Sequence, residues 1–265
     1  MKGAAFMTAT HPVPVPWLVT VFVVCISAAV EVRTAAAAPP PDDEWHLTTE
    51  LALWGTSADG TAGARGIQAD VDVGFSDIFN HLDFGAMGDV ALYKGNWIFM
   101  FNGFYARLED DQTFNDGRGG AITSDMGFAD FALGYTIVRT EVGDHMPLTI
   151  TPAIGVRYTY LKIELNPNQF PTFDDHRDWW DPYVGGQVVL GLNPKLDWRT
   201  QATIGGWGVG SDSVWSGATF LDWHFRDNMA VNVGYRAMSW DYEDGGFKWD
   251  MTLYGPWIGF TVKWF

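Results

Sequence analysis

Apolar and polar residues alternate along much of the chain after Trp45. In LTITPAIGVRYTY, at 148–160, large apolar side chains fall on one face and Thr, Ala, Gly and Arg157 on the other. The segments 196–204 and 229–236 repeat this split. A period of two predicts β-strands. The first segment alternates over thirteen residues, which is longer than the five or six typical of strands in soluble proteins.

A soluble β-sandwich also alternates, with its charged face in water. Three features favour a membrane barrel instead: strands of ten or more residues, small polar residues with single arginines on the second face, and Trp or Tyr near strand ends. No run of twenty apolar residues follows Trp45, which excludes helical spans. The predicted fold class is therefore all-β, a transmembrane antiparallel up-and-down β-barrel.

The number of strands follows from parity. Eleven segments are strand-like, but bacterial single-chain barrels have even numbers of strands. Short periplasmic turns and longer outer loops alternate consistently when 67–73, a short segment with Asp70 and Asp72, is not counted. Ten strands remain, and eight or twelve are the alternatives. They are predicted near 45–54, 83–93, 96–108, 125–139, 147–164, 181–192, 196–209, 213–225, 228–241 and 250–265.

Residues 55–82 then form one long first loop on the outer side. Within this loop the sequence FSDIFNHL predicts a helical turn with Ser76 as its N-cap. We expect this element either to fold into the lumen as a partial plug or to rest on the rim.

The N-terminal 37 residues are predicted to be a signal peptide. Lys2 lies in a long n-region, residues 17–30 form a short apolar core, and the alanines at 35–38 offer a cleavage site. The apolar core is too short for a membrane helix, which needs about 20 residues. The only cysteine, Cys25, lies in this segment, and a mature chain without cysteine suits an oxidising compartment. Residues 38–44 form a predicted polar linker, and 45–265 the barrel domain.

Composition supports this organisation and excludes one class of partner. The chain is 47% apolar and 15% aromatic but only 18% charged, with 30 glycines. Many short strands with tight turns explain such a composition. The net charge of −16, with no basic cluster, excludes a nucleic-acid partner.

The chain ends in GPWIGFTVKWF, an aromatic terminus. This ending resembles that of bacterial outer-membrane barrels, whose last strand closes the barrel and carries a terminal aromatic read by the assembly machinery. The resemblance implies that Phe260, Val262, Trp264 and Phe265 form the assembly signal. Ile258, Phe260, Val262 and Trp264 share one face, so Trp264 takes the in-register place and Phe265 falls one residue out of phase.

Longer stretches support the same resemblance. DVDVGFSDIFNHLDFGAMGDVALYKGNW, DPYVGGQ, GGWGVGSD and the final VGYRAMSWDYEDGGFKWDMTLYGPWIGFTVKWF resemble a family of proteobacterial outer-membrane β-barrel proteins, broadly similar to OmpA- and OmpW-type barrels. The resemblance implies a location in the outer membrane and contact with its lipid and lipopolysaccharide. It also implies assembly by the barrel-assembly machinery and periplasmic chaperones. We expect a monomer. The family has no settled chemistry to transfer.

Candidate chemistry is sparse. Asp222 and His224 form an Asp-x-His pair similar to that of omptin proteases, but this pair is predicted near the periplasmic end of the barrel, away from the extracellular mouth that omptins use. Acidic runs at 109–111, 174–178 and 241–244 offer oxygen ligands, although solvated loops explain them equally well. We therefore expect no enzymatic activity, no cofactor and no metal site.

The inward face carries the remaining candidates. Charges are expected in the lumen, because an arginine in the lipid at the membrane midplane costs about 2–4 kcal/mol. The predicted polar network consists of Asp130, Arg157, Arg199, Asp222, His224 and Arg236. We expect a structural or surface protein, either with or without a narrow polar conduit. The alternatives are a small-solute channel and, third, a membrane-embedded hydrolase using Asp222 and His224.

Overall fold

The computed structural model describes residues 43–64, 67–113, 119–143, 146–167 and 173–265. The predicted signal peptide and most of the predicted linker lie outside these ranges. Among the described residues, no helix is long and apolar enough to cross a bilayer.

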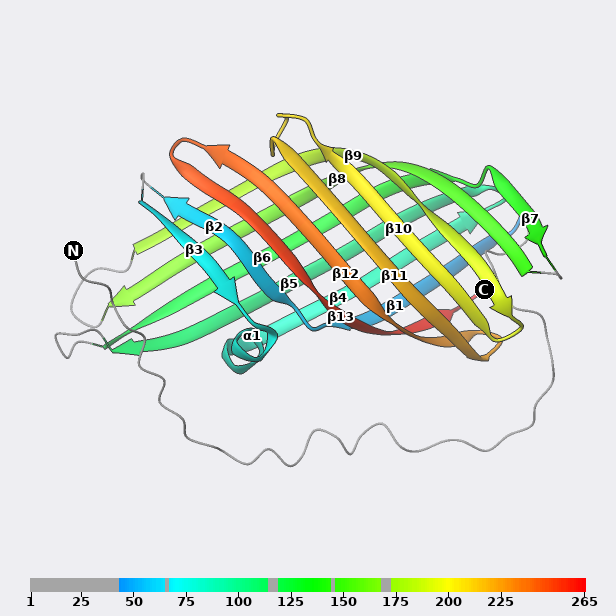
Figure 1. Ribbon diagram of the computed structural model, residues 1–265, viewed down its shortest axis with the longest axis horizontal. Coiled ribbons are helices and arrows are strands. Elements are labelled where there is room, and N and C mark those ends of the chain that lie inside the picture. Colours follow the sequence, from blue (N-terminus) through cyan, green and yellow to red (C-terminus); the bar gives the residue numbers. More distant parts are fainter. Residues whose placement is uncertain (1–42, 65–66, 114–118, 144–145, 168–172) are drawn as a thin grey trace, which may run out of the picture. The chain divides into compact units, whose positions relative to one another are not determined.

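Ten strands form a closed antiparallel barrel (Figure 1), as predicted. They are β1 (Trp45–Trp54), β4 (Leu82–Lys94), β5 (Trp97–Thr113), β6 (Gly119–Tyr135), β8 (Met146–Pro167), β9 (Phe173–Asn193), β10 (Leu196–Gly206), β11 (Ser213–Arg226), β12 (Met229–Asp244) and β13 (Phe247–Lys263). Each strand pairs with the next in this order, and β1 pairs with both β4 and β13. Closure leaves no free sheet edge in this ring, so the backbone hydrogen bonds of the wall are satisfied internally.

The two ends of the barrel differ. At one end, here named the turn end, two-residue connections at 95–96, 194–195 and 227–228 join successive strands, and β1 begins and β13 ends there. A short strand, β7 (Val138–Val142), pairs with β8 at this end. The opposite end, here named the loop end, carries the connection at 207–212 and the segment between β1 and β4. One loop-end connection is shorter than predicted, because Gly245 and Gly246 have positive φ and form a tight hairpin turn.

The segment 55–82 is more ordered than the single loop predicted for it. It forms two strands, β2 (Ser57–Ala64) and β3 (Ile67–Val73), followed by the helix α1 (Phe75–His81). The amide of Gly55 donates to Pro256 O at 2.8 Å, and β2 then continues along β13 above β1. The strand β3 pairs with β2 as a hairpin. The prediction that 67–73 is not one of the ten barrel strands is therefore correct, although this segment is a strand.

The predicted N-cap of α1 is wrong. Gly74, not Ser76, precedes the helix, and its extended backbone places its carbonyl to accept from the amides of Asp77 and Ile78 at 3.1 Å each. No side chain caps this end. The helix has no buried residue, and it does not plug the lumen.

Large apolar side chains cover the outer face of the barrel. In most soluble proteins such residues would be buried, since extended apolar patches are rarely exposed. Aromatic residues bound the band on both sides: Trp45, Trp97, Tyr135, Trp198, Trp223 and Trp264 toward the turn end, and Trp180, Trp215 and Tyr235 toward the loop end. The exposed aliphatic and Phe residues between them are Leu51, Leu53, Val90, Phe99, Phe101, Phe131, Ile154, Val156, Val184, Val188, Ile204, Leu221, Val233 and Ile258.

The inward side chains of the loop-end half are also apolar and pack into a core, here named the aromatic plug. Trp179 and Tyr242 stack with centroids 3.9 Å apart, and Phe128 stacks on Phe104 at 5.1 Å. Trp240 is completely buried. The sequence prediction of small polar residues on the inward face fails here, because these strands also place large rings in the inward phase. The plug comprises Ala52, Met87, Phe128, Leu161, Trp179, Val214, Ala218, Phe220, Met238, Trp240, Tyr242, Phe247, Met251, Leu253 and Trp257.

Candidate functional site

The structure places all six residues of the predicted polar network on the lumenal face, but not as one connected network. Arg157 and Asp130 are direct cross-strand neighbours on β8 and β6. Arg157 Nε and Nη2 donate to the two oxygens of Asp130 at 2.6 and 3.0 Å. The guanidinium carbon lies 5.6–5.7 Å from the ring centroids of Phe128, Tyr183 and Trp240. This bidentate pair is therefore held against the underside of the aromatic plug.

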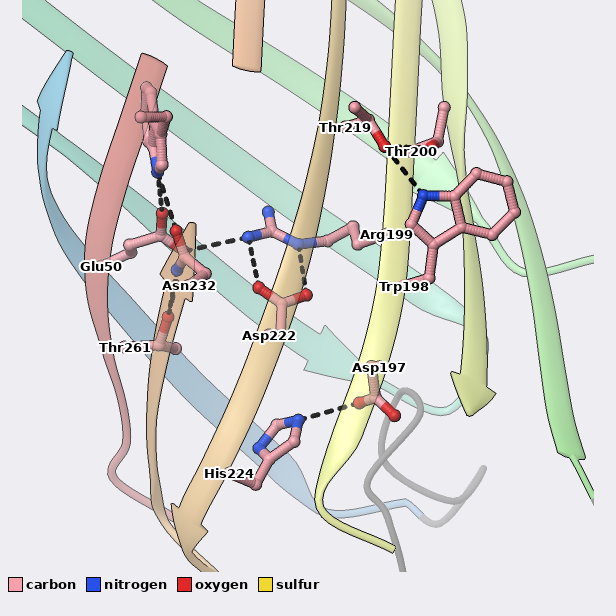
Figure 2. A network of polar contacts seen from close by, with 11 residues as sticks. Glu50, Asp197, Trp198, Arg199, Thr200, Thr219, Asp222, His224, Asn232 and Thr261 are labelled. Atoms are coloured by element: carbon pink, nitrogen blue, oxygen red, sulfur yellow. Dashed lines mark hydrogen bonds and ion pairs between the residues drawn. The ribbon is translucent and has the colours of Figure 1, made fainter. Parts of the chain in front are cut away.

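Arg199 connects a second cluster (Figure 2). Its Nε and Nη2 each donate to an oxygen of Asp222 at 3.0 Å, and Nη2 also reaches Glu50 Oε2 at 3.3 Å. The guanidinium lies 4.4 Å above the ring of Phe220. Arg199 thus neutralises carboxylates from two non-adjacent strands, β11 and β1.

Sequence analysis missed the residues that complete this cluster. Trp257 Nε1 donates to Asn232 Oδ1 at 2.8 Å and to Glu50 Oε1 at 3.2 Å. Thr261 Oγ1 donates to Glu50 Oε2 at 3.0 Å. Each of these residues lies in the inward phase of its strand, and that phase was the available signal. The hydrogen-bond partners of these residues could not be named without the order of the strands around the barrel.

Asp222 and His224 do not form the pair that the hydrolase alternative needs. Both oxygens of Asp222 accept from Arg199, whereas His224 Nε2 lies 2.8 Å from Asp197 Oδ2 on the neighbouring strand β10. Figure 2 shows the two interactions separated along the barrel wall. The two residues share a face of β11 but serve different partners.

Arg236 lies at the boundary between the plug and the polar half of the lumen. Its Nη2 donates to Asn102 Oδ1 at 3.1 Å. Its guanidinium carbon lies 5.3–5.6 Å from the ring centroids of Phe128, Trp54 and Trp257. Cation–π contact with three rings helps to offset the loss of hydration of this buried charge.

A cavity of about 570 Å³ occupies the turn-end half of the lumen. Residues of the turn end, including His46, Asp227 and Phe265, line its mouth, and Asn102, Tyr183 and Arg236 lie at its inner end. Most of the residues that line it are polar. The charged residues in that lining are Glu50, Asp89, Asp130, Asp197, Asp222, Asp227, Arg199, Arg236 and Lys263.

One row of lumenal residues follows the cross-strand register through six strands. The row is Glu50, Asp89, Asn102, Asp130, Arg157 and Asp181, in which each residue is the direct partner of the next. At the far end of this row, the Asp181 carboxylate accepts from Ser211 N at 2.6 Å, Ser211 Oγ at 2.9 Å and Trp179 Nε1 at 2.9 Å. These bonds tie the 207–212 connection to the barrel interior.

A separate ionic cluster lies on the outer face, on the loop side of the apolar band. Asp125 accepts from Arg107 Nε and Tyr105 Oη at 2.7 Å each. Hydrogen bonding by Arg107 holds the pKa of the Asp125 carboxyl below its usual range, and burial opposes this shift less strongly. This pair is a structural ion pair at the surface.

The predicted assembly signal lies where the alternation places it. Phe260 and Val262 are the cross-strand partners of Leu51 and Thr49 on β1. Beyond the end of β13, Trp264 N donates to Leu47 O at 2.9 Å, and Trp264 Nε1 donates to Thr49 Oγ1 at 2.9 Å. Leu47 N in turn donates to Phe265 O at 3.0 Å. The terminal residues therefore continue the pairing that closes the barrel.

Among the described residues, no group of three or more His, Cys, Asp or Glu side chains is arranged to hold a metal ion. The acidic runs at 109–111 and 174–178 lie only partly within the residues whose side chains are described.

Comparison of the sequence with protein-family models and with curated proteins finds no match. Among solved structures, the outer membrane protease OmpT from Escherichia coli is similar at 9% identity, with 86% of this chain and 99% of that chain covered and a TM-score of 0.48. Neisserial surface protein A is similar at 11% identity, covering 83% and 97%, with a TM-score of 0.30. The P. putida toluene transporter TodX is similar at 8% identity, covering 85% and 90%, with a TM-score of 0.25. At identities and TM-scores this low, no role of those proteins can be assigned to this chain.

Proposed function

We propose that this chain is an integral outer-membrane β-barrel protein with a structural or surface role, and that it is not an enzyme. The exposed apolar band bounded by aromatic residues on both sides supports a membrane location, because this pattern matches the hydrocarbon layer and its two interfaces. Outer-membrane lipid and lipopolysaccharide are then the molecules that contact the band. The C-terminal strand, with its paired Trp264 and Phe265, is the segment offered to the assembly machinery.

The observation that carries the structural role is the aromatic plug. Its most deeply buried members, Met238, Trp240 and Met251, are at most 1% exposed, and they come from β12 and β13, across the lumen from Phe128 on β6 and Trp179 on β9. Close-packed side chains of this kind leave no room for water. A barrel filled in this way does not conduct solutes. Its role is that of a structural element of the membrane that presents the residues of its loop end.

The non-enzymatic proposal is supported by the pairings within the lumen. Both carboxylate oxygens of Asp222 accept hydrogen bonds from Arg199, and His224 is hydrogen-bonded to Asp197. A hydrolase would need an imidazole within reach of a nucleophile or an activated water. The contacts of these two residues instead match a polar network that satisfies inward charges.

Planar-bilayer recording of the refolded protein tests the closed lumen. Heat-modifiable migration on a gel first verifies that the barrel is folded. We expect no stable conductance steps from the folded protein in potassium chloride, at low or high concentration. Reproducible ohmic steps from a folded sample would overturn the closed barrel and favour the small-solute channel instead.

A further inference from the structure

Two carboxylates face each other inside the turn-end cavity. Glu50 on β1 and Asp89 on β4 are direct cross-strand partners, and both line the cavity. The Cβ atoms of such partners are about 4.5–5.5 Å apart, and like charges at this position destabilise a sheet. The low dielectric of the barrel interior strengthens the repulsion. A cation beside the pair would relieve this repulsion.

Only one of the two carboxylates forms an ion pair with the protein. Glu50 accepts from Arg199, Thr261 and Trp257. Within the described part of the chain, Asp89 forms no ion pair, and its polar partner on the next strand is the Asn102 amide. Arg199 and Arg236 act on Asp89 through space but donate their hydrogen bonds to other groups, Arg199 to Asp222 and Glu50 and Arg236 to Asn102.

The excess of negative charge extends over the whole cavity. Its lining holds six carboxylates, from Glu50, Asp89, Asp130, Asp197, Asp222 and Asp227, but only three permanent cations, from Arg199, Arg236 and Lys263. Arg157, just outside the lining, balances one more carboxylate through its pair with Asp130. The cavity therefore attracts positive charge.

Small side chains leave room in front of the carboxylate pair. Thr48 and Ala91 are the cross-strand partners next to Glu50 and Asp89 on the side of the mouth, and both line the cavity. His46 and Tyr93 are the next lining pair, nearer the mouth. A molecule that enters from the turn end thus passes an aromatic rim and reaches Asp89 over small residues. The volume of about 570 Å³ is in the range of small-molecule sites.

We propose that this cavity binds a small organic cation, with its ammonium group at Asp89 and its carbon chain toward Tyr93. An ammonium supplies the charge that Asp89 lacks and donates hydrogen bonds to the carboxylate. The aromatic rim suits an organic cation, because a ring face attracts both its charge and its carbon chain. A bare metal ion fits less well, since the described residues provide no group of three metal-binding side chains. The proposal goes beyond the structural role and does not depend on it, because binding requires only the folded barrel.

Calorimetric titration of the refolded protein in detergent micelles with n-butylammonium chloride tests the proposal. Sodium butyrate is the matched anion, and magnesium chloride tests for a bare cation. We expect butylammonium to bind and butyrate not to bind. Asp89→Asn preserves side-chain volume and should weaken butylammonium binding at least tenfold. Asp125→Asn, which removes an outward carboxylate, is the matched control and should leave binding unchanged. Heat-modifiable migration verifies the fold of each variant.

Several results would overturn the proposal. The first is that butylammonium does not bind to the folded wild type, and the second is that butyrate binds equally well. The third is that magnesium binds as well as butylammonium and that Asp89→Asn weakens its binding too. The fourth is that Asp89→Asn binds butylammonium as tightly as the wild type. Conductance steps in bilayers would instead overturn the closed-lumen function and leave the binding result standing.

Discussion

Removal of Arg157 should destabilise the barrel strongly, because it leaves a carboxylate in the lumen without its cation. Arg157 is 1% exposed and forms a bidentate pair with Asp130. Breaking a buried pair by removing one partner costs about 3–5 kcal/mol. The side chain of Asp130 is 12% exposed and lines the cavity, so water can reach it. We therefore expect Arg157→Met to lower the free energy of unfolding by about 3 kcal/mol, the lower end of that range.

The double variant Asp130→Asn/Arg157→Met separates charge from packing. It removes the unpaired carboxylate and keeps the volume beside Phe128, Tyr183 and Trp240. Exchange of a whole buried ion pair for neutral groups is often close to neutral, so the double variant should recover most of the stability lost in Arg157→Met. Urea unfolding in detergent micelles, followed by tryptophan fluorescence, measures both. A loss below about 1 kcal/mol in Arg157→Met, the level of an exposed pair, would refute the reasoning. So would a double variant no more stable than the single one.

Three further predictions concern the plug, the outer ion pair and the terminus. Trp240→Ala should cost about 3–5 kcal/mol in urea unfolding, because it empties the centre of the plug; a cost below 1 kcal/mol would mean that the plug is loosely packed. Arg107 lowers the folded-state pKa of Asp125, so the pair contributes its full stability above the unfolded-state pKa of about 3.9. This contribution is lost as the pH falls through the folded-state pKa, and Asp125→Asn should remove that acid-dependent part in an unfolding series from pH 6 to pH 2. Trp264→Ala should impair assembly, measured as the heat-modifiable band, more than deletion of Phe265, which leaves the alternation intact; the opposite order would shift the functional register of the closing strand by one residue.

Sequence alternation was sufficient to predict which way most strand residues face. The period of two in 148–160 assigned Arg157 to the lumen and Ile154 to the outer face, and the structure has them so. Parity and the lengths of the connections predicted ten strands and their order along the chain. These properties are local, because each side chain in a strand points opposite to its neighbours whatever the strand pairs with.

The aromatic plug shows where local reasoning failed. Trp179, Trp240 and Trp257 lie in the inward phase of their strands, although small polar residues were predicted for the inward face. Phase alone does not distinguish a polar lumen from a packed one, because that depends on which inward residues from distant strands lie at the same height. The β2–β3 hairpin was missed for a related reason: it joins the sheet by pairing of the short segment 57–64 with β13, which is far away in the sequence.

The sequence by itself determined the class of the fold, the number of barrel strands and the facing of their side chains. Only the tertiary structure decided that Arg199 joins Asp222 to Glu50, that Asp222 and His224 serve separate partners, and that Asp89 faces Glu50 without a cation of its own. The physical reason is that side-chain phase repeats every two residues within one strand, whereas these contacts depend on closure of the ring. Closure brings β1 beside β13 and fixes the register between strands, and contacts between residues as far apart as Glu50 and Trp257 exist only once the barrel is complete.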